Sequence, residues 1–159
     1  MSAAPPSPPY GAYAAICGAF VGGLGVAGAF AHALGREPSE HDGLDVFVLA
    51  AATFKAVRTL ARDEVTSFLR ERFVDGAVHE GGEQPRETGD LRQAIGELVT
   101  CSRCIGTWAA AGLGSAQILA PRFGRLLTWS LAAAAANDSM QAGFEALTGA
   151  ANRLNSNAS

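Results

Sequence analysis

A 22-residue run without a charged side chain, residues 13–34, constrains this chain more than any other feature. As an α-helix the run would be about 33 Å long, and the hydrocarbon core of a bilayer is about 30 Å thick. The run therefore predicts a membrane-spanning helix. A cleaved signal peptide is the alternative, with small-x-small cleavage sites at residues 29–31 and 31–33. The segment before the run contains no Lys or Arg, whereas signal peptides begin with a basic region.

Three further apolar segments follow the first one. They cover residues 44–61, 104–120 and 126–147. The segment 44–61 is near the lower length limit for a span, so it either crosses the bilayer or lies in its interface. From these segments we expect an all-α integral membrane protein with three to four transmembrane helices.

Composition supports a membrane location and excludes several other classes of protein. Charged residues make up 17% of the chain, against about 25% in soluble domains. The net charge is −3, which argues against a strongly basic nucleic-acid-binding protein. Three cysteines are too few for a disulfide-dense secreted scaffold.

The rest of the chain is expected to form a head, a loop and a tail around these spans. We expect a proline-rich N-terminal head over residues 1–12, a helical membrane domain over 13–148 and a C-terminal tail over 149–159. Residues 75–90, rich in glycine and acids, predict a flexible loop. Asp90 and Gln93 then predict a capping box for an amphipathic helix over residues 91–100.

Arginines set the expected orientation. Six of them lie between residues 62 and 103, and positive residues favour the cytoplasmic side of a membrane. We therefore expect a multi-pass protein of the cytoplasmic (inner) membrane, with the long loop in the cytoplasm.

Two groups of polar residues repeat with helical spacing. Their members are Lys55, Arg58 and Arg62 in the second segment, and Asp138, Gln141 and Glu145 in the fourth. The basic group predicts an interfacial edge whose charged ends reach the headgroups. The second group predicts intramembrane polar residues, which are costly and are therefore functional candidates. The alternative is that Asp138 pairs internally, for instance with Lys55 or Arg58, and that Glu145 lies at the surface.

Small residues repeat every four positions in two of the expected spans. They are Gly18 and Gly22 in the first, and Gly106, Ala110 and Gly114 in the third. Such stripes let helix backbones approach closely, so we expect helix–helix contacts there.

The Cys101-x-x-Cys104 pair is the only motif with a catalytic pattern. Two cysteines three residues apart share a helix face, and Arg103 would favour the thiolate. A metal site needs about four ligands, and the remaining Cys and His residues are scattered. Three interpretations stay open, namely packing at the membrane entrance, thiol–disulfide exchange and metal binding. We expect packing, because the chain contains no second ligand pair.

The stretch from Leu98 to Trp108, which reads LVTCSRCIGTW, resembles a family of uncharacterised bacterial membrane proteins, domain of unknown function 1360 (DUF1360). Its members show Cys-x-x-Cys-x-Gly-x-Trp at the entry to a span. Further matches are FKAVR at 54–58, DEVTS at 63–67 continuing to Leu69, Arg70 and Phe73, and Asn137-Asp138 with Gln141. The resemblance covers residues 44–147. This chain has Phe68, Arg72 and Ser102 where family members usually have proline. The resemblance implies a small multi-span membrane protein without an established activity, and some relatives are labelled sporulation-associated.

The functional expectation is a non-enzymatic structural or accessory subunit of a larger membrane complex. Its expected partners are the lipid bilayer and other membrane-protein subunits, with no nucleic acid and no cofactor. The first alternative is a thiol-redox or metal-handling protein that uses Cys101 and Cys104. The weaker alternative is a transporter-like element that uses Asp138.

Overall fold

Helices make up nearly all of the regular structure in the computed structural model, which describes residues 8–36, 42–76 and 83–157. The helices are α1 (Tyr10–Ala33), α2 (Gly43–Arg62), the 3₁₀ turn η1 (Glu64–Thr66), α3 (Ser67–Arg70), α4 (Leu91–Thr100), α5 (Ser102–Leu119) and α6 (Pro121–Asn157). A short antiparallel ribbon joins β1 (Val74–Asp75) to β2 (Gln84–Pro85). The described part of the chain thus has the expected helical character.

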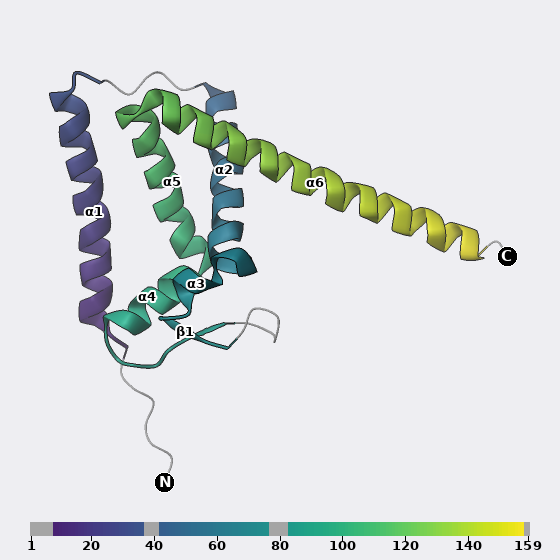
Figure 1. Ribbon diagram of the computed structural model, residues 1–159, viewed down its shortest axis with the longest axis horizontal. Helices are drawn as coiled ribbons and strands as arrows, with labels where there is room; N and C mark the ends of the chain where they lie inside the picture. The colour runs from purple at the N-terminus through teal and green to yellow at the C-terminus, as the bar shows by residue number, and fades with distance from the viewer. Residues whose placement is uncertain (1–7, 37–41, 77–82, 158–159) are drawn as a thin grey trace, which may run out of the picture.

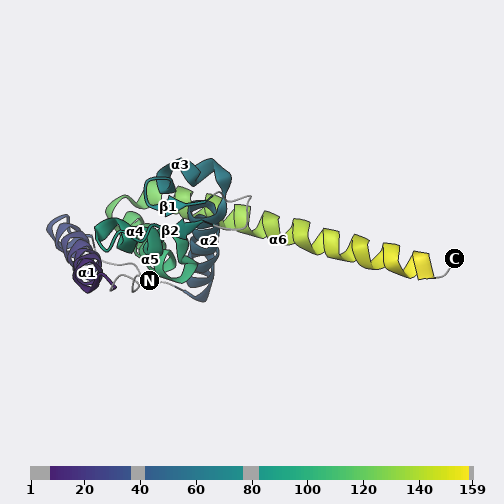
Figure 2. The same ribbon diagram turned by 90° about the horizontal axis from the view of Figure 1, so that it is seen from below.

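The helices α1, α5 and α2 stand side by side, with α5 in the middle (Figure 1). α3, α4 and the ribbon gather at one end of these three helices, where α2 ends and α5 begins. α6 begins at the other end, packs against both α2 and α5, and then extends far beyond the body (Figure 1 and Figure 2). The buried side chains of α2, α5 and α6 are mostly small, and four of these seven come from α2: Val48, Ala52, Val57, Ala61, Leu113, Thr128 and Ala135.

α1 is the most apolar helix and one of the least buried. It has 24 residues, so it is about 36 Å long. Only 6% of its most apolar stretch is buried in the structure. The helix ends at Ala33, and Gly35, with a φ of +61°, closes a Schellman motif in which Arg36 N–H donates to the carbonyl of Ala31 at 2.8 Å. Within the described residues, α1 is the one helix long and apolar enough to cross a membrane, and it is a candidate anchor or signal sequence.

The expectation of three to four membrane spans is therefore wrong. The segments 44–61, 104–120 and 126–147 do form helices, but α2, α5 and α6 do not qualify as spans in the described chain. Their polar residues are the physical reason, because Lys55 and Asp138 interrupt the apolar runs and Gln117 lies inside α5. These side chains bond between helices, as when Gln117 Nε2 donates to Thr128 Oγ1 at 2.9 Å.

The region after α3 contains a short antiparallel ribbon, where a flexible loop was expected over residues 75–90. β1 and β2 pair across it, and residues 77–82 lie outside the described residues. α4 follows with the bounds expected from the sequence. Asp90 Oδ1 accepts from the backbone N–H of Arg92 at 2.8 Å, and Gln93 Oε1 accepts from Gly89 N–H at 2.9 Å. The two side chains thus cap α4, although with a different pairing from the expected capping box.

Two close approaches in this fold require glycine. A Cβ on Gly96 of α4 would lie 2.5 Å from the carbonyl oxygen of Phe73, and one on Gly124 of α6 would lie 2.5 Å from the backbone of Ala116. Gly96 lets α4 pack directly on the ribbon, and Gly124 makes the tight α5–α6 turn.

The ends of the chain differ from the expected head and tail. Residues 1–7 of the expected head lie outside the described residues, and α1 already begins at Tyr10. At the other end, residues 149–157 of the expected tail continue α6 as a helix, and residues 158–159 lie outside the described residues. α6 has 37 residues and is about 55 Å long.

Candidate functional site

The cysteine pair lies at the junction between α4 and α5. Cys101 is the N-cap residue of α5, and its sulfur accepts from the backbone N–H of Cys104 at 3.3 Å. Both thiols are free, with Cys104 exposed and Cys101 half-buried. The pair therefore sits at the positive end of the helix dipole, where a thiolate is favoured.

The two thiols differ in their acidity. Hydrogen bonds from the side chain and then the backbone N–H of Cys104 lower the pKa of the Cys101 thiol. The pKa of the Cys104 thiol is raised, because it donates to Cys101 and is partly desolvated. Cys101 is therefore the more acidic of the two thiols. In the described chain, no group of three or more His, Cys, Asp or Glu residues is placed to hold a metal ion.

The polar residues expected inside the membrane lie on α6, outside any candidate span. The carboxylate of Asp138 accepts from Lys55 Nζ at 2.8 Å, so the structure contains the internal pair that the sequence left as an alternative. The two side chains are 22% and 35% exposed for Lys55 and Asp138. Gln141 and Glu145 lie further along α6 and are exposed. The structure therefore does not bring the three residues together into one site.

The basic residues of α2 divide into two kinds. Lys55 is neutralised by Asp138 on α6, whereas Arg58 and Arg62 are exposed and form no ion pair within the described residues. Both arginines border a groove between α2 and α5, across which lies Arg103. The three basic residues that repeat along α2 thus differ in the fold. The first is paired with Asp138, and the other two are exposed.

Of the four glycines in these stripes, one has another helix within 4 Å of an added Cβ in the described residues. Gly106 of α5 lies against Val57 of α2, where an added Cβ would be 3.7 Å from the Val57 Cγ2 atom. Gly18, Gly22 and Gly114 face open space. Ala110 lines the groove between α2 and α5. α1 instead meets the body through the Phe20 and Trp108 rings, 5.1 Å apart edge to face, and through Tyr13, whose hydroxyl donates to Glu97.

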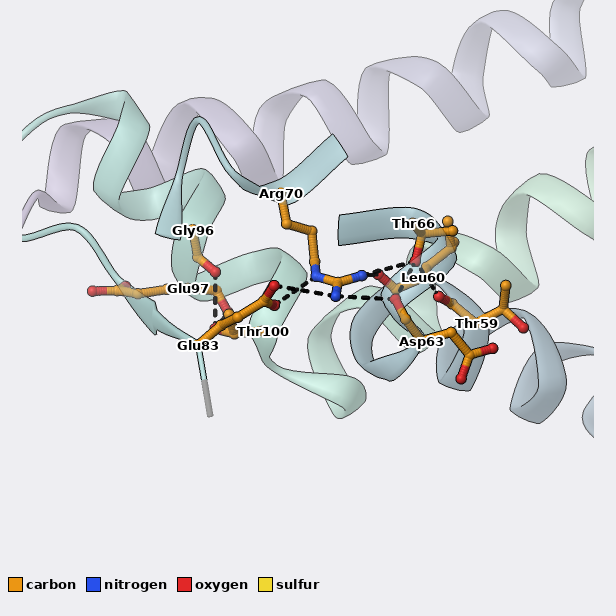
Figure 3. A network of polar contacts seen from close by, with 9 residues as sticks. All are labelled: Thr59, Leu60, Asp63, Thr66, Arg70, Glu83, Gly96, Glu97 and Thr100. Carbon is orange, nitrogen blue, oxygen red and sulfur yellow. Dashed lines mark hydrogen bonds and ion pairs between the residues drawn. The ribbon is translucent and has the colours of Figure 1, made fainter. Parts of the chain in front are cut away.

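Arg70 is the centre of a polar network for which sequence reasoning assigned no role. It is 1% exposed, and its side chain reaches from α3 between α2 and the residue before β2 (Figure 3). Nε donates to Glu83 Oε2 at 2.6 Å and Nη2 donates to Glu83 Oε1 at 3.2 Å. Nη1 donates to the Leu60 carbonyl at 2.6 Å and to Thr66 Oγ1 at 2.8 Å, and Nη2 also donates to the Asp63 carbonyl at 3.2 Å.

This network is structural, because the guanidinium has five N–H donors and all five are used. No donor remains for a ligand. The network ties the C-terminal end of α2 to α3 and to the ribbon, and thereby holds the end of the body at which the cysteine pair lies. The signal in the sequence was the DEVTS-x-LR stretch of residues 63–70, which carries Asp63, Thr66 and Arg70 with one-turn spacing.

Comparisons with known proteins place the chain in a family. The sequence signature of the family described as "Protein of unknown function (DUF1360)" matches residues 48–144, which include α5, most of α2 and the first part of α6. The "Sporulation protein YjcA" of Bacillus subtilis (strain 168) is 31% identical over 104 residues, a match that covers 58% of this chain and 84% of that protein. No solved structure matches the chain. α1 and the last part of α6 lie outside the family match. Because the match covers more than half of the chain, this chain belongs to the DUF1360 family.

Proposed function

We propose that this protein is a non-enzymatic accessory subunit that α1 anchors in the cytoplasmic membrane. The observation that carries the proposal is the exposed apolar surface of α1. A helix of about 36 Å is long enough for a hydrocarbon core of about 30 Å. A core helix of a soluble protein would be buried, whereas α1 is 6% buried over its most apolar stretch. Insertion into a lipid bilayer would remove this surface from water and keep every backbone hydrogen bond of the helix intact.

Charge distribution supports a cytoplasmic body. All twelve Lys and Arg residues follow α1, beginning with Arg36. By the positive-inside rule the helices after α1 then face the cytoplasm. This is a single-anchor arrangement, and it requires α1 to separate from α5, against which the rings of Phe20 and Trp108 pack in the structure.

The projecting part of α6 supports the role of a subunit. Its exposed large apolar residues recur with spacings of four, three and seven: Met140, Phe144, Leu147 and Leu154. This is the seam spacing of helices that pair. The four side chains are between 67% and 74% exposed, so the seam has no partner among the described residues. We therefore expect a helix of another membrane-protein subunit to pack along it.

The test of the anchor is alkaline carbonate extraction of membranes that contain the full chain. Wild type is expected in the pellet. Val21 is 67% exposed, so Val21→Arg inserts a charge in the middle of α1 without disturbing the body, and this variant is expected in the supernatant. Val21→Leu is the matched control and should stay in the pellet. Quantitative release of wild type would refute the anchor, and a mature chain that begins after residue 31 or 33 would identify α1 as a cleaved signal.

The partner interaction needs a separate test. Phe144→Glu with Leu147→Glu should abolish co-purification of a stoichiometric membrane-protein partner. The control Ser130→Glu places a charge on an exposed position of α6 near the body. Equal recovery of the partner with all three proteins would exclude the distal seam as the docking surface.

Thiol–disulfide exchange is a second candidate function, favoured by the lowered pKa of Cys101 at the N-terminus of α5. In this reaction the Cys101 thiolate attacks a substrate disulfide, forms a mixed disulfide and releases one substrate thiolate. The Cys104 thiol loses its proton to solvent and attacks the Cys101 sulfur. The second substrate thiolate leaves, and a dithiol reductant then restores the pair.

The two functions make opposite predictions for the cysteines. If exchange occurs, Cys104→Ala should trap a mixed disulfide on Cys101 that a reducing gel removes, and Cys101→Ala should trap none. If the protein is an accessory subunit only, both variants should be free of adducts and should assemble like wild type.

A further inference from the structure

We infer that the groove between α2 and α5 binds one acyl chain of an anionic phospholipid, with the phosphate held by Arg58, Arg62 and Arg103. The groove has a volume of about 920 Å³. It lies on the body and not on α1, so the inference stands whether α1 is an anchor or a signal sequence.

The walls of the groove suit a hydrocarbon chain. The exposed side chains of Val46 and Phe54 lie along the α2 wall of the groove. On the facing wall, the small residues Gly106 and Ala110 of α5 leave space for a ligand. From Val46 to Arg58 the helix rises about 18 Å, and one leaflet of a bilayer's hydrocarbon core is about 15 Å thick. The apolar length of the groove therefore matches one extended acyl chain.

The charged residues of the groove gather at one end. Arg58 and Arg62 belong to the last turns of α2, and Arg103 belongs to the first turn of α5, which runs in the opposite direction beside it (Figure 1). Ser102 adds a hydroxyl group at the same end, and the N-terminus of α5 adds the positive end of its dipole.

No carboxylate among the described residues pairs with these arginines. The residues that line the groove include no Asp or Glu, and none of the three arginines forms an ion pair in the described chain. This is unusual in a protein with a net charge of −3, where acidic residues outnumber basic ones. An anion with an apolar tail satisfies both ends of the groove, because arginine forks match phosphate oxygens and the tail covers the apolar walls.

The experiment measures lipid retained by the full-length protein purified in a non-ionic detergent. The protein is incubated with mixed micelles that contain equal amounts of phosphatidylglycerol and phosphatidylcholine, and the bound lipid is quantified by mass spectrometry. We expect about one phosphatidylglycerol per chain and little phosphatidylcholine. Arg58→Gln with Arg103→Gln should weaken phosphatidylglycerol binding at least about tenfold, the factor that about 1.4 kcal/mol of lost binding produces. Arg122→Gln, with Arg92→Gln, removes the same charge on exposed faces outside the groove and should leave retention unchanged.

Two further arms separate the tail from the head. Ala50→Trp fills the exposed apolar part of the groove and should abolish retention, whereas Ala133→Trp, on an exposed face of α6, should not. Glycerol phosphate, which has the head without the tail, should compete poorly. Equal retention of the two lipids, equal loss in the two double-arginine variants, or full displacement by glycerol phosphate would each overturn the inference.

Discussion

Replacing Arg70 by methionine tests the polar network that fixes the end of the helical body. Methionine keeps the unbranched stem and removes the charged end. The change leaves the Glu83 carboxylate, 7% exposed, without its cation. It also leaves the carbonyls of Leu60 and Asp63 without these donors. The Asp63 carbonyl would keep its hydrogen bonds from the hydroxyl and backbone N–H of Thr66, so the buried Glu83 carboxylate is the group that loses most.

The size of the effect follows from this geometry. Removing one partner of a buried ion pair costs about 3–5 kcal/mol, because the other charge stays buried and uncompensated. For a chain of this size each kcal/mol shifts the midpoint of thermal unfolding by about 2–4 °C. Arg70→Met is therefore expected to lower the midpoint by roughly 6–20 °C. Arg70→Lys should also destabilise, since one ammonium group cannot reproduce the two-pronged contact with Glu83.

The measurement is thermal unfolding of the full chain in detergent, followed by tryptophan fluorescence. Arg72→Met is the matched control, because Arg72 is exposed and lies two residues after Arg70. This variant should unfold at the same temperature as wild type. A double change of Arg70→Met with Glu83→Gln should cost less than the sum of the single changes, since the stranded charge is gone. A loss below about 1 kcal/mol for Arg70→Met would show that the pair behaves like an exposed one and would refute the reasoning.

Three further predictions follow from individual contacts. Gly96→Ala should destabilise by about 1–3 kcal/mol through its clash with a backbone carbonyl, whereas Gly114→Ala, which meets open space, should be neutral or stabilising, as measured by thermal unfolding. Alkylation followed by mass mapping should modify Cys101 at lower pH than Cys104, because the pKa of the first thiol is lowered and that of the second is raised; the reverse order would contradict the assigned hydrogen bond. Asp138→Asn should cost about 1 kcal/mol or less of unfolding free energy, since its ion pair is partly exposed.

The sequence predicts local structure well where the signal is local. The amphipathic pattern of residues 91–100 coincides with α4, and the second apolar segment, 44–61, lies within α2. Both helices have side-chain caps, Asp90 and Asp42, which mark their starts. Helix existence and approximate bounds therefore follow from spacing and capping alone.

The environment of a helix does not follow from its pattern in the same way. An apolar run that packs on another helix and one that faces lipid have similar composition, and the sequence reads both as spans. α5 illustrates this, because it packs against α2, α1 and α6 and is not apolar enough to qualify as a span. The length of α6 was also missed, since no proline or cap separates the segment 126–147 from the residues after it.

The candidate site could be predicted only in part. The hydrogen bond between Cys101 and Cys104 follows from their i, i+3 spacing at a helix start. Arg70 could not be assigned, because its partners are 4 to 13 residues away and come from a turn, a helix end and the residue before β2. The DEVTS-x-LR spacing carries Asp63 and Thr66, but the contact with Glu83 depends on tertiary placement, which that local pattern does not encode.

Lys55 and Arg58 show how tertiary placement gives neighbouring residues of one charge pattern two different environments. On the helix they are neighbours, one turn apart. α6 brings Asp138 within 2.8 Å of Lys55, so that charge is neutralised by the fold itself. α6 crosses α2 away from its C-terminal end (Figure 1), and in the described chain it brings no carboxylate to the groove beside Arg58. A guanidinium without a carboxylate partner attracts anions from outside the chain. The same crossing of α6 over α2 that stabilises the body therefore leaves the basic end of the groove open to an anion from outside.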